Sequence, residues 1–293
     1  MTQFSTIGRP RKIIEGRAKV TGATRYATDL TMPGMLHARL VTSPYAHATI
    51  NHIDIETAMD APGVVAVLTA ADMPDLPPHN RARLLLARGR AMFVGQPVAL
   101  VLAETEAAAQ DGSELVIVDY DPHPAAITID EALAESAPLV WPDGPPGDSE
   151  EAAAHGAEVT DAARNGQKPS NVVDQMEMGR GDVDAGFAAA DVIVEKTITT
   201  PRAPQNYLEP HATLVQIDPF TGGAKVWTST QAPFVVREQV AAALQIPESD
   251  VEVVATPVGG AFGAKFLLYQ PLVALAAEAA GRPVRLVLNR LEE

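Results

Sequence analysis

The sequence predicts an α+β fold with two domains, and three observations support this prediction. Residues 26–139 alternate short apolar runs with turn residues, a pattern that is typical of strands. Residues 104–114, which lie between two of these runs, begin a helical pattern. Residues 141–170 then change to Pro, Gly, Ala, Asp and Glu, a composition that cannot bury much apolar surface. A chain of 293 residues is long enough for two domains with a core each.

Each further element is expected from its own residues. Apolar and β-branched runs predict strands in both halves of the chain, at residues 35–41, 64–68, 97–103, 115–120, 192–200, 212–217, 224–230 and 284–288. A helix is expected at residues 233–244, where Pro233 suits the first turn. A second helix is expected at about residues 267–280, because Gly281 suits the position just after a helix end.

Composition and charge exclude several classes of function. No apolar run approaches the roughly 20 residues that a membrane span needs, and a net charge of -15 argues against nucleic acid as a partner. The chain has no cysteine, which excludes disulfides, thiolate zinc sites and cysteine-ligated iron–sulfur clusters on it. The histidines show no metal-ligand spacing, so no metal bound directly by side chains is expected. Because residues 1–12 lack an apolar export signal, we expect a cytoplasmic protein.

The most informative segment is residues 251–265, where a β-branched run leads into a glycine-rich turn. We expect this turn to open directly into a helix, so that bare backbone N–H groups at a helix N-terminus favour an anion, an oxo group or a phosphate. The spacing of Gly259, Gly260 and Gly263 matches neither a Walker A loop nor the dinucleotide fingerprint. These residues alone leave open an ordinary strand-to-helix turn.

Several motifs in the same order resemble the molybdenum hydroxylases, a family that includes xanthine dehydrogenase, aldehyde oxidase and aerobic carbon monoxide dehydrogenase. Residues 19–26, 43–48 and 94–98 resemble the N-terminal α/β hammerhead domain of the large subunit. Residues 231–234 and the loop at 259–265 resemble the first, mixed α/β part of its molybdopterin-binding domain. The resemblance spans nearly the whole chain.

This resemblance implies a division of the chain and an incomplete pocket. It implies a hammerhead domain at residues 1–140, an acidic Pro/Gly-rich linker at 141–170 and a partial molybdopterin-binding domain at 171–293. Nothing in the chain matches the family's Gly-x-Gly-Glu segment, which carries the catalytic glutamate. We therefore expect a second molybdopterin-binding chain to supply that glutamate.

The resemblance also implies roles for individual residues. Gln231 stands where the family's glutamine lies beside the apical oxo group of molybdenum, so it is the expected catalytic residue. Backbone contacts to the cofactor are expected from Gly260, Ala261, Phe262 and Gly263. Glu209 and Phe266 are expected at the substrate pocket, and Phe266 replaces an acidic residue of purine-oxidising relatives, which makes purines less favoured substrates. Structural alternatives stay open, namely a helix-capping Gln231, a core aromatic Phe262 and a structural Glu209.

The implied function is that of a molybdenum-dependent oxidoreductase that oxidises an aldehyde, an N-heterocycle or a related small molecule, with water as the oxygen source. The implied cofactor is Mo-molybdopterin, in a dinucleotide form shared with the second chain. Partner subunits that carry a 2Fe-2S cluster and FAD would complete a hetero-oligomer. Two alternatives remain at this point: a non-catalytic truncated scaffold or assembly module with the same fold, and a nucleotide-binding module that uses the glycine loop.

Overall fold

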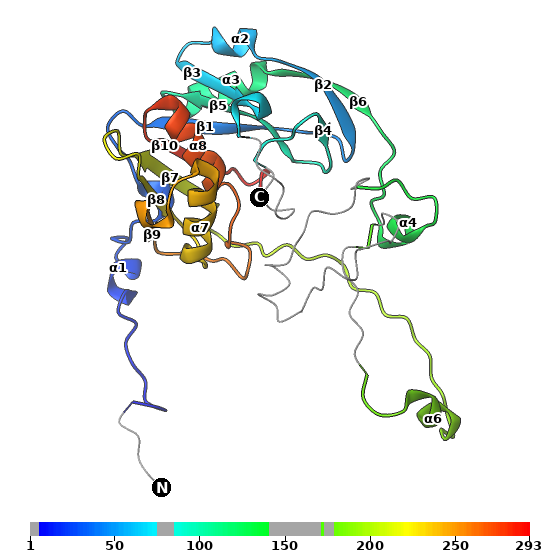
Figure 1. Ribbon diagram of the computed structural model, residues 1–293. Coiled ribbons are helices and arrows are strands. Elements are labelled where there is room, and N and C mark those ends of the chain that lie inside the picture. The colour runs from blue at the N-terminus through cyan, green and yellow to red at the C-terminus, as the bar shows by residue number, and fades with distance from the viewer. Residues whose placement is uncertain (1–5, 75–84, 141–170, 173–178) are drawn as a thin grey trace.

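A computed structural model describes residues 6–74, 85–140, 171–172 and 179–293. It confirms the α+β fold, because helices cover a seven-stranded sheet that stands beside a three-stranded sheet (Figure 1). The strands are β1 Leu36–Thr42, β2 Ala48–Asp54, β3 Val64–Thr69, β4 Arg90–Ala91, β5 Pro97–Ala103, β6 Ile117–Pro122, β7 Ala212–Ile217, β8 Ala224–Thr228, β9 Val251–Ala255 and β10 Val284–Val287. The helices are α1 Gly16–Val20, α2 Glu56–Met59, α3 Glu106–Leu115, α4 Ile129–Leu133, α6 Val183–Ala188, α7 Pro233–Leu244 and α8 Gln270–Ala280, with 3-10 turns η1 Ala27–Asp29, η2 Ala70–Asp72 and η5 Glu248–Asp250.

The large sheet joins the two halves of the chain. Its order is β3-β5-β1-β10-β7-β8-β9, and β1 pairs with β10 in parallel, with Leu36 opposite Val284. The guanidinium of Arg285 on β10 also donates hydrogen bonds to the carbonyl oxygens of Thr28 and Leu30, at 3.0 and 2.9 Å. Strands from both halves therefore lie in one sheet. The division into two domains stays a prediction, and the expected linker at 141–170 lies outside the described residues.

The core is shared in the same way. The main apolar cluster combines Leu36 and Leu100 from the first half with Leu272 and Leu286 from the second. We expected a separate core in each half, but the continuous sheet brings the apolar faces of both halves together. Successive residues of β5 alternate between this cluster and a smaller one, which contains Ala99 and Val101 along with Ala58 of α2. Because neighbouring strand residues face opposite sides of a sheet, both faces of β5 are covered.

Several elements lie where the sequence predicts them. The strands β5 and β7 and the helix α7 have the expected bounds, and Gly281 has the left-handed conformation (φ 59°) expected just after α8. The expectation that the glycine-rich turn opens directly into a helix is wrong, because α8 begins only at Gln270. Pro271 in the first turn of α8 and the Gln270 side chain, which accepts a hydrogen bond from the Leu268 N–H at 2.8 Å, fix this later start.

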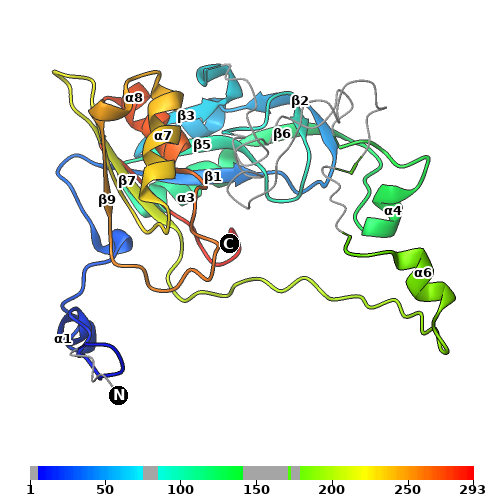
Figure 2. The ribbon, with the colours of Figure 1, turned by 60° about the horizontal axis from the view of Figure 1, so that its bottom comes forward.

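Residues 179–206, which we call the arm, leave the body of the molecule altogether. The arm contains α6 and then runs back to the body in an extended course, as both Figure 1 and Figure 2 show. Every residue of the arm is exposed, and residues 192–200 belong to no strand. The expected strand at 192–200 is therefore not formed among the described residues, although the backbone there is extended. In the described part of the chain, no helix has the length and apolar character required to cross a membrane.

Candidate cofactor-binding site

Gln231 lies between β8 and α7 and faces the glycine loop. Its backbone N–H donates to the Lys265 carbonyl at 2.7 Å, and its side-chain Oε1 accepts from the N–H of Gly263 at 3.1 Å. The neighbouring Thr230 hydroxyl donates to the Phe266 carbonyl at 2.9 Å. The Nε2 of Gln231 has no acceptor within the described part of the chain, and the side chain is exposed. Since an amide nitrogen only donates, the free end of Gln231 is suited to an acceptor atom such as an oxo group.

The loop backbone requires glycine at two of its turns. Gly260 and Gly263 have φ values of 105° and 90°, which disfavour other residues. A Cβ added at Gly260 would also lie 3.1 Å from the Tyr207 Cβ. Phe262 between them has a φ of 52°, which is uncommon for a bulky residue and marks a functional or strained position. Its side chain is 75% exposed, so the alternative of an ordinary core aromatic is excluded.

The same loop leaves backbone donors free. No acceptor among the described residues receives the N–H groups of Gly260, Ala261 or Phe262. Successive free N–H groups around left-handed turns form a concave site for an anionic or oxo ligand. Together with the free Nε2 of Gln231, these donors fit the polar groups of a molybdopterin cofactor.

A buried ion pair lies directly behind the loop. The Nζ of Lys265 is 2.8 Å from the Oε2 and 2.8 Å from the carbonyl oxygen of Glu209, and it lies 4.9 Å from the centre of the Tyr207 ring. Lys265 is 1% exposed and Glu209 is 8% exposed. A buried position for Lys265 is not predicted from the sequence, since lysine is rarely buried. The only available signal was the position of this lysine at the end of the glycine loop.

Glu209 also holds the loop through its backbone. Its Oε2 accepts from the N–H of Gly259 at 2.6 Å, and its own N–H donates to the Gly259 carbonyl at 3.2 Å. A Cβ at Gly259 would lie 2.7 Å from the Glu209 Cβ, so no other residue fits there without movement. The Oε1 of Glu209 is buried without a partner among the described residues. In this chain Glu209 therefore points at the loop, whereas Phe266 is half exposed beside it.

A second polar cluster supports the same segment from the other side. The Tyr207 hydroxyl contacts the Glu293 carboxylate and lies 2.9 Å from the His211 Nδ1, and the His211 N–H donates to Glu293 at 2.6 Å. Burial raises the pKa of Glu293, but hydrogen bonds from Tyr207 and His211 lower the pKa by more, so the net shift is downward. Burial and the nearby charges of Glu292 and Glu293 raise the pKa of Tyr269 to about 12. Residues 207–211 are thus held by two sets of contacts, one with Lys265 of the loop and one with Glu293.

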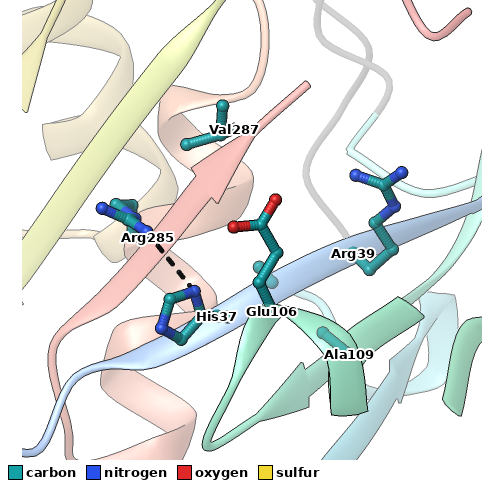
Figure 3. Close-up of a pocket in the computed structure, with 7 residues that line it drawn as sticks. His37, Arg39, Glu106, Ala109, Arg285 and Val287 are labelled. Carbon is teal, nitrogen blue, oxygen red and sulfur yellow. Dashed lines mark hydrogen bonds between the residues drawn. The ribbon is translucent and has the colours of Figure 1, made fainter. Parts of the chain in front are cut away.

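A separate cluster of charged side chains lies at the seam between β1 and β10 (Figure 3). There His37 and Arg39 from β1, Glu106 from α3 and Arg285 from β10 line a cavity of about 10 Å³. The Arg285 Nη2 is 3.5 Å from the His37 Nδ1. Burial, followed by the charge of Arg285, lowers the pKa of His37. This volume is room for about one water molecule and not for an organic cofactor, so the glycine loop is the better candidate.

Comparisons with known proteins agree with this choice. The family model for the molybdopterin cofactor-binding domain matches residues 164–293, which include Gln231 and the whole loop. The family model for the aldehyde oxidase and xanthine dehydrogenase a/b hammerhead domain matches residues 21–124. Among the described residues, no group of three or more His, Asp or Glu side chains could hold a metal ion directly.

Individual relatives match nearly the whole chain. A probable xanthine dehydrogenase subunit of Bacillus subtilis is 33% identical, over 98% of this chain and 35% of its own length. The carbon monoxide dehydrogenase large chain of Afipia carboxidovorans is 34% identical over the same shares. The crystal structure of quinoline 2-oxidoreductase from Pseudomonas putida 86 superposes with a TM-score of 0.80 at 32% identity, over 95% of this chain and 34% of that one.

These matches identify the domains that the chain contains and the share of each relative that it covers. The chain spans about a third of the length of these relatives. Its matched domains are the hammerhead domain and the molybdopterin cofactor-binding domain, in the order expected from the sequence. The chain therefore belongs to the molybdenum hydroxylase family, where it corresponds to part of the molybdopterin-binding large subunit.

Proposed function

We propose that this chain forms one wall of the molybdopterin pocket in a hydroxylase that oxidises an aldehyde, an N-heterocycle or a related small molecule, with water as the oxygen source. The observation that carries the proposal is a set of donors at the glycine loop that have no acceptor among the described residues. These donors are the Nε2 of Gln231 and the backbone N–H groups of residues 260–262.

Each group of residues has a definite task in this proposal. Gln231 donates from Nε2 to an oxo acceptor, and the N–H of Gly263 holds its other end in place. The N–H groups of Gly260, Ala261 and Phe262 bind acceptor atoms of the cofactor. Such donors are most effective when they are oriented before the ligand arrives. The bound molybdenum cofactor supplies the redox chemistry, and this chain supplies orientation and polar contacts.

The Glu209–Lys265 pair orients the loop in the same proposal. Because Lys265 is tied to both the carboxylate and the carbonyl of Glu209, the glycine turn cannot move away from residues 207–211 without separating buried charges. Phe266, half exposed beside the loop, borders the substrate side of the pocket, and the absence of an acidic side chain at this position disfavours a purine substrate. Glu209 acts on that side only through the loop that it holds.

The proposal requires other chains. A second molybdopterin-binding chain would supply the catalytic glutamate and the rest of the cofactor contacts, including those to a dinucleotide form of the pterin. Subunits with a 2Fe-2S cluster and FAD would accept the electrons. The chain spans about a third of the length of the relatives that it matches.

Replacing Gln231 tests the proposal directly. In the assembled enzyme, Gln231→Ala should lower turnover by roughly 10²-fold, because removal of one donor to a developing or fixed anion costs that much. Molybdenum and pterin content should stay unchanged. Gln216→Ala on β7 is the matched control, since Gln216 is an exposed glutamine remote from the loop. Normal turnover of Gln231→Ala at full molybdenum occupancy would exclude Gln231 from the reaction.

A further inference from the structure

The arm carries a strand-forming segment that has no sheet to join. Of the nine residues at 192–200, the seven Val, Ile and Thr residues are β-branched and favour strands. Val192, Ile193, Val194 and Ile198 are between 60% and 83% exposed. An extended segment with unpaired backbone groups and exposed apolar side chains is a template for pairing with another strand.

Other exposed apolar residues continue this surface. Val183 and Phe187 lie four residues apart on α6, so they share one face of the helix, and both are more than half exposed. At the other end of the arm, Leu208 is exposed next to Gly260, whose added Cβ would lie 3.6 Å from the Leu208 backbone nitrogen. Phe262 on the loop is exposed as well. Uncovered apolar side chains thus lie on α6, at residues 192–198 and at Leu208 beside the candidate site, and such exposed apolar groups mark an interface.

The position of the arm within the matched domain favours one occupant for this surface. The arm lies inside residues 164–293, the part matched by the molybdopterin cofactor-binding domain. In the relatives, this part belongs to chains about three times as long as the present one. The arm also leads at residue 207 directly into the segment that holds the glycine loop. A polypeptide that completes the pocket would therefore lie next to the arm.

We infer that residues 192–198 add an edge strand to a sheet of the second molybdopterin-binding chain. This inference rests on the proposed function and names the surface through which the two chains assemble. Backbone hydrogen bonds would give the pairing its affinity, and alternate side chains such as Val192 and Val194 would fill apolar pockets on the partner.

Hydrogen exchange of the intact complex tests this pairing. The complex is purified from its natural host through a tag on this chain, and its other chains are identified by mass spectrometry. The amides of residues 192–198 should exchange slowly in the complex. Residues 12–14, which lie exposed ahead of α1 and whose N–H groups have no acceptor among the described residues, are the internal control and should exchange rapidly.

A double variant, Val192→Asp with Val194→Asp, provides the second measurement. It should lower recovery of the second chain by roughly tenfold or more, because two apolar side chains can no longer be buried. Phe220→Asp, which changes an exposed apolar residue in the turn between β7 and β8, should leave recovery unchanged. Slow exchange of the β5 amides in the double variant would confirm that the chain itself is folded.

The outcomes separate the two proposals. Fast exchange at 192–198 in a molybdenum-loaded complex, or full recovery of the second chain with the double variant, would overturn the strand pairing and leave the proposed function intact. A purified assembly without molybdenum or a second molybdopterin-binding chain would overturn the proposed function, and the pairing with it.

Discussion

The strand β5 and the arm segment at 192–200 give the same prediction from sequence but have opposite surroundings. Both are short runs rich in apolar or β-branched residues, and both are predicted to be strands. Every residue of β5 is buried, because β5 pairs with β1 on one side and β3 on the other. Every residue at 192–200 is exposed and unpaired among the described residues. Local sequence therefore specifies an extended backbone, while a neighbouring strand decides whether that backbone becomes part of a sheet.

The same contrast divides the chain by role. The body, by which we mean the two sheets and the helices that cover them, is held together by its own contacts. Both halves of the chain share one sheet and one main core there. Among the described residues, the arm belongs neither to this sheet nor to this core, and it leads into the segment that orients the glycine loop. The body should therefore determine stability, and the arm should determine assembly.

The largest effect on stability is expected where the body holds the candidate site. Lys265→Met should lower the free energy of unfolding by about 3–5 kcal/mol, because it leaves the carboxylate of Glu209 buried without its partner. Urea denaturation of the purified protein measures this change. The matched control is Lys225→Met, which removes an exposed ion pair with Glu252 and should cost at most about 1 kcal/mol. Equal losses for the two variants would show that the buried pair has no special role.

A pair of truncations tests the contrast between β5 and the arm. Leu100→Ala on β5 should lower the free energy of unfolding by about 2–5 kcal/mol, because it opens a cavity in the main core. Val194→Ala in the arm should change the stability of the isolated chain by less than about 0.5 kcal/mol. A large loss of stability with Val194→Ala would mean that the arm packs on the body of its own chain.

The smallest effect is expected at the seam between β1 and β10. The pKa of His37 lies below its ordinary value of 6.5 in the folded protein, so the unfolded chain binds a proton first as the pH falls. The stability tied to neutral His37 is complete above about pH 6.5 and is lost as the pH falls through the folded pKa. Melting temperatures between about pH 8 and pH 5 should therefore fall less for His37→Gln than for the unchanged protein.

The control for this measurement is His52→Gln, which replaces an exposed histidine on β2. This variant should keep the pH dependence of the unchanged protein. If both variants show the same pH dependence as the unchanged protein, the seam does not contribute to stability in this pH range.

The sequence predicts the locally determined parts of the structure well. Residues 97–103, 212–217 and 233–244 have the right elements and bounds, because hydrophobic patterning and Pro233 act over short distances. The pairing of β1 with β10 could not be predicted, since it joins segments far apart in the chain. The predicted start of this helix at about residue 267 is too early, because Pro271 and the Gln270 side chain set the first turn of α8 at Gln270.

The candidate site also contains parts that the sequence predicts and parts that it does not. The glycine loop and Gln231 were found through motifs that resemble a known family, and the structure brings them together through the hydrogen bond between Gly263 and Gln231. The buried pair behind them was not predicted, because Glu209 and Lys265 are distant in the sequence and each is usually exposed. The roles of Gln231, Glu209, Phe266 and residues 260–263 toward a ligand stay predictions.

The central claim is that the free donors of Gln231 and of residues 260–262 bind the molybdopterin cofactor. An experimental structure of the cofactor-loaded assembly tests it most directly. We predict cofactor atoms within hydrogen-bonding distance of the Gln231 Nε2 and of the loop N–H groups. A map in which side chains fill that space, with the cofactor bound elsewhere, would contradict the claim.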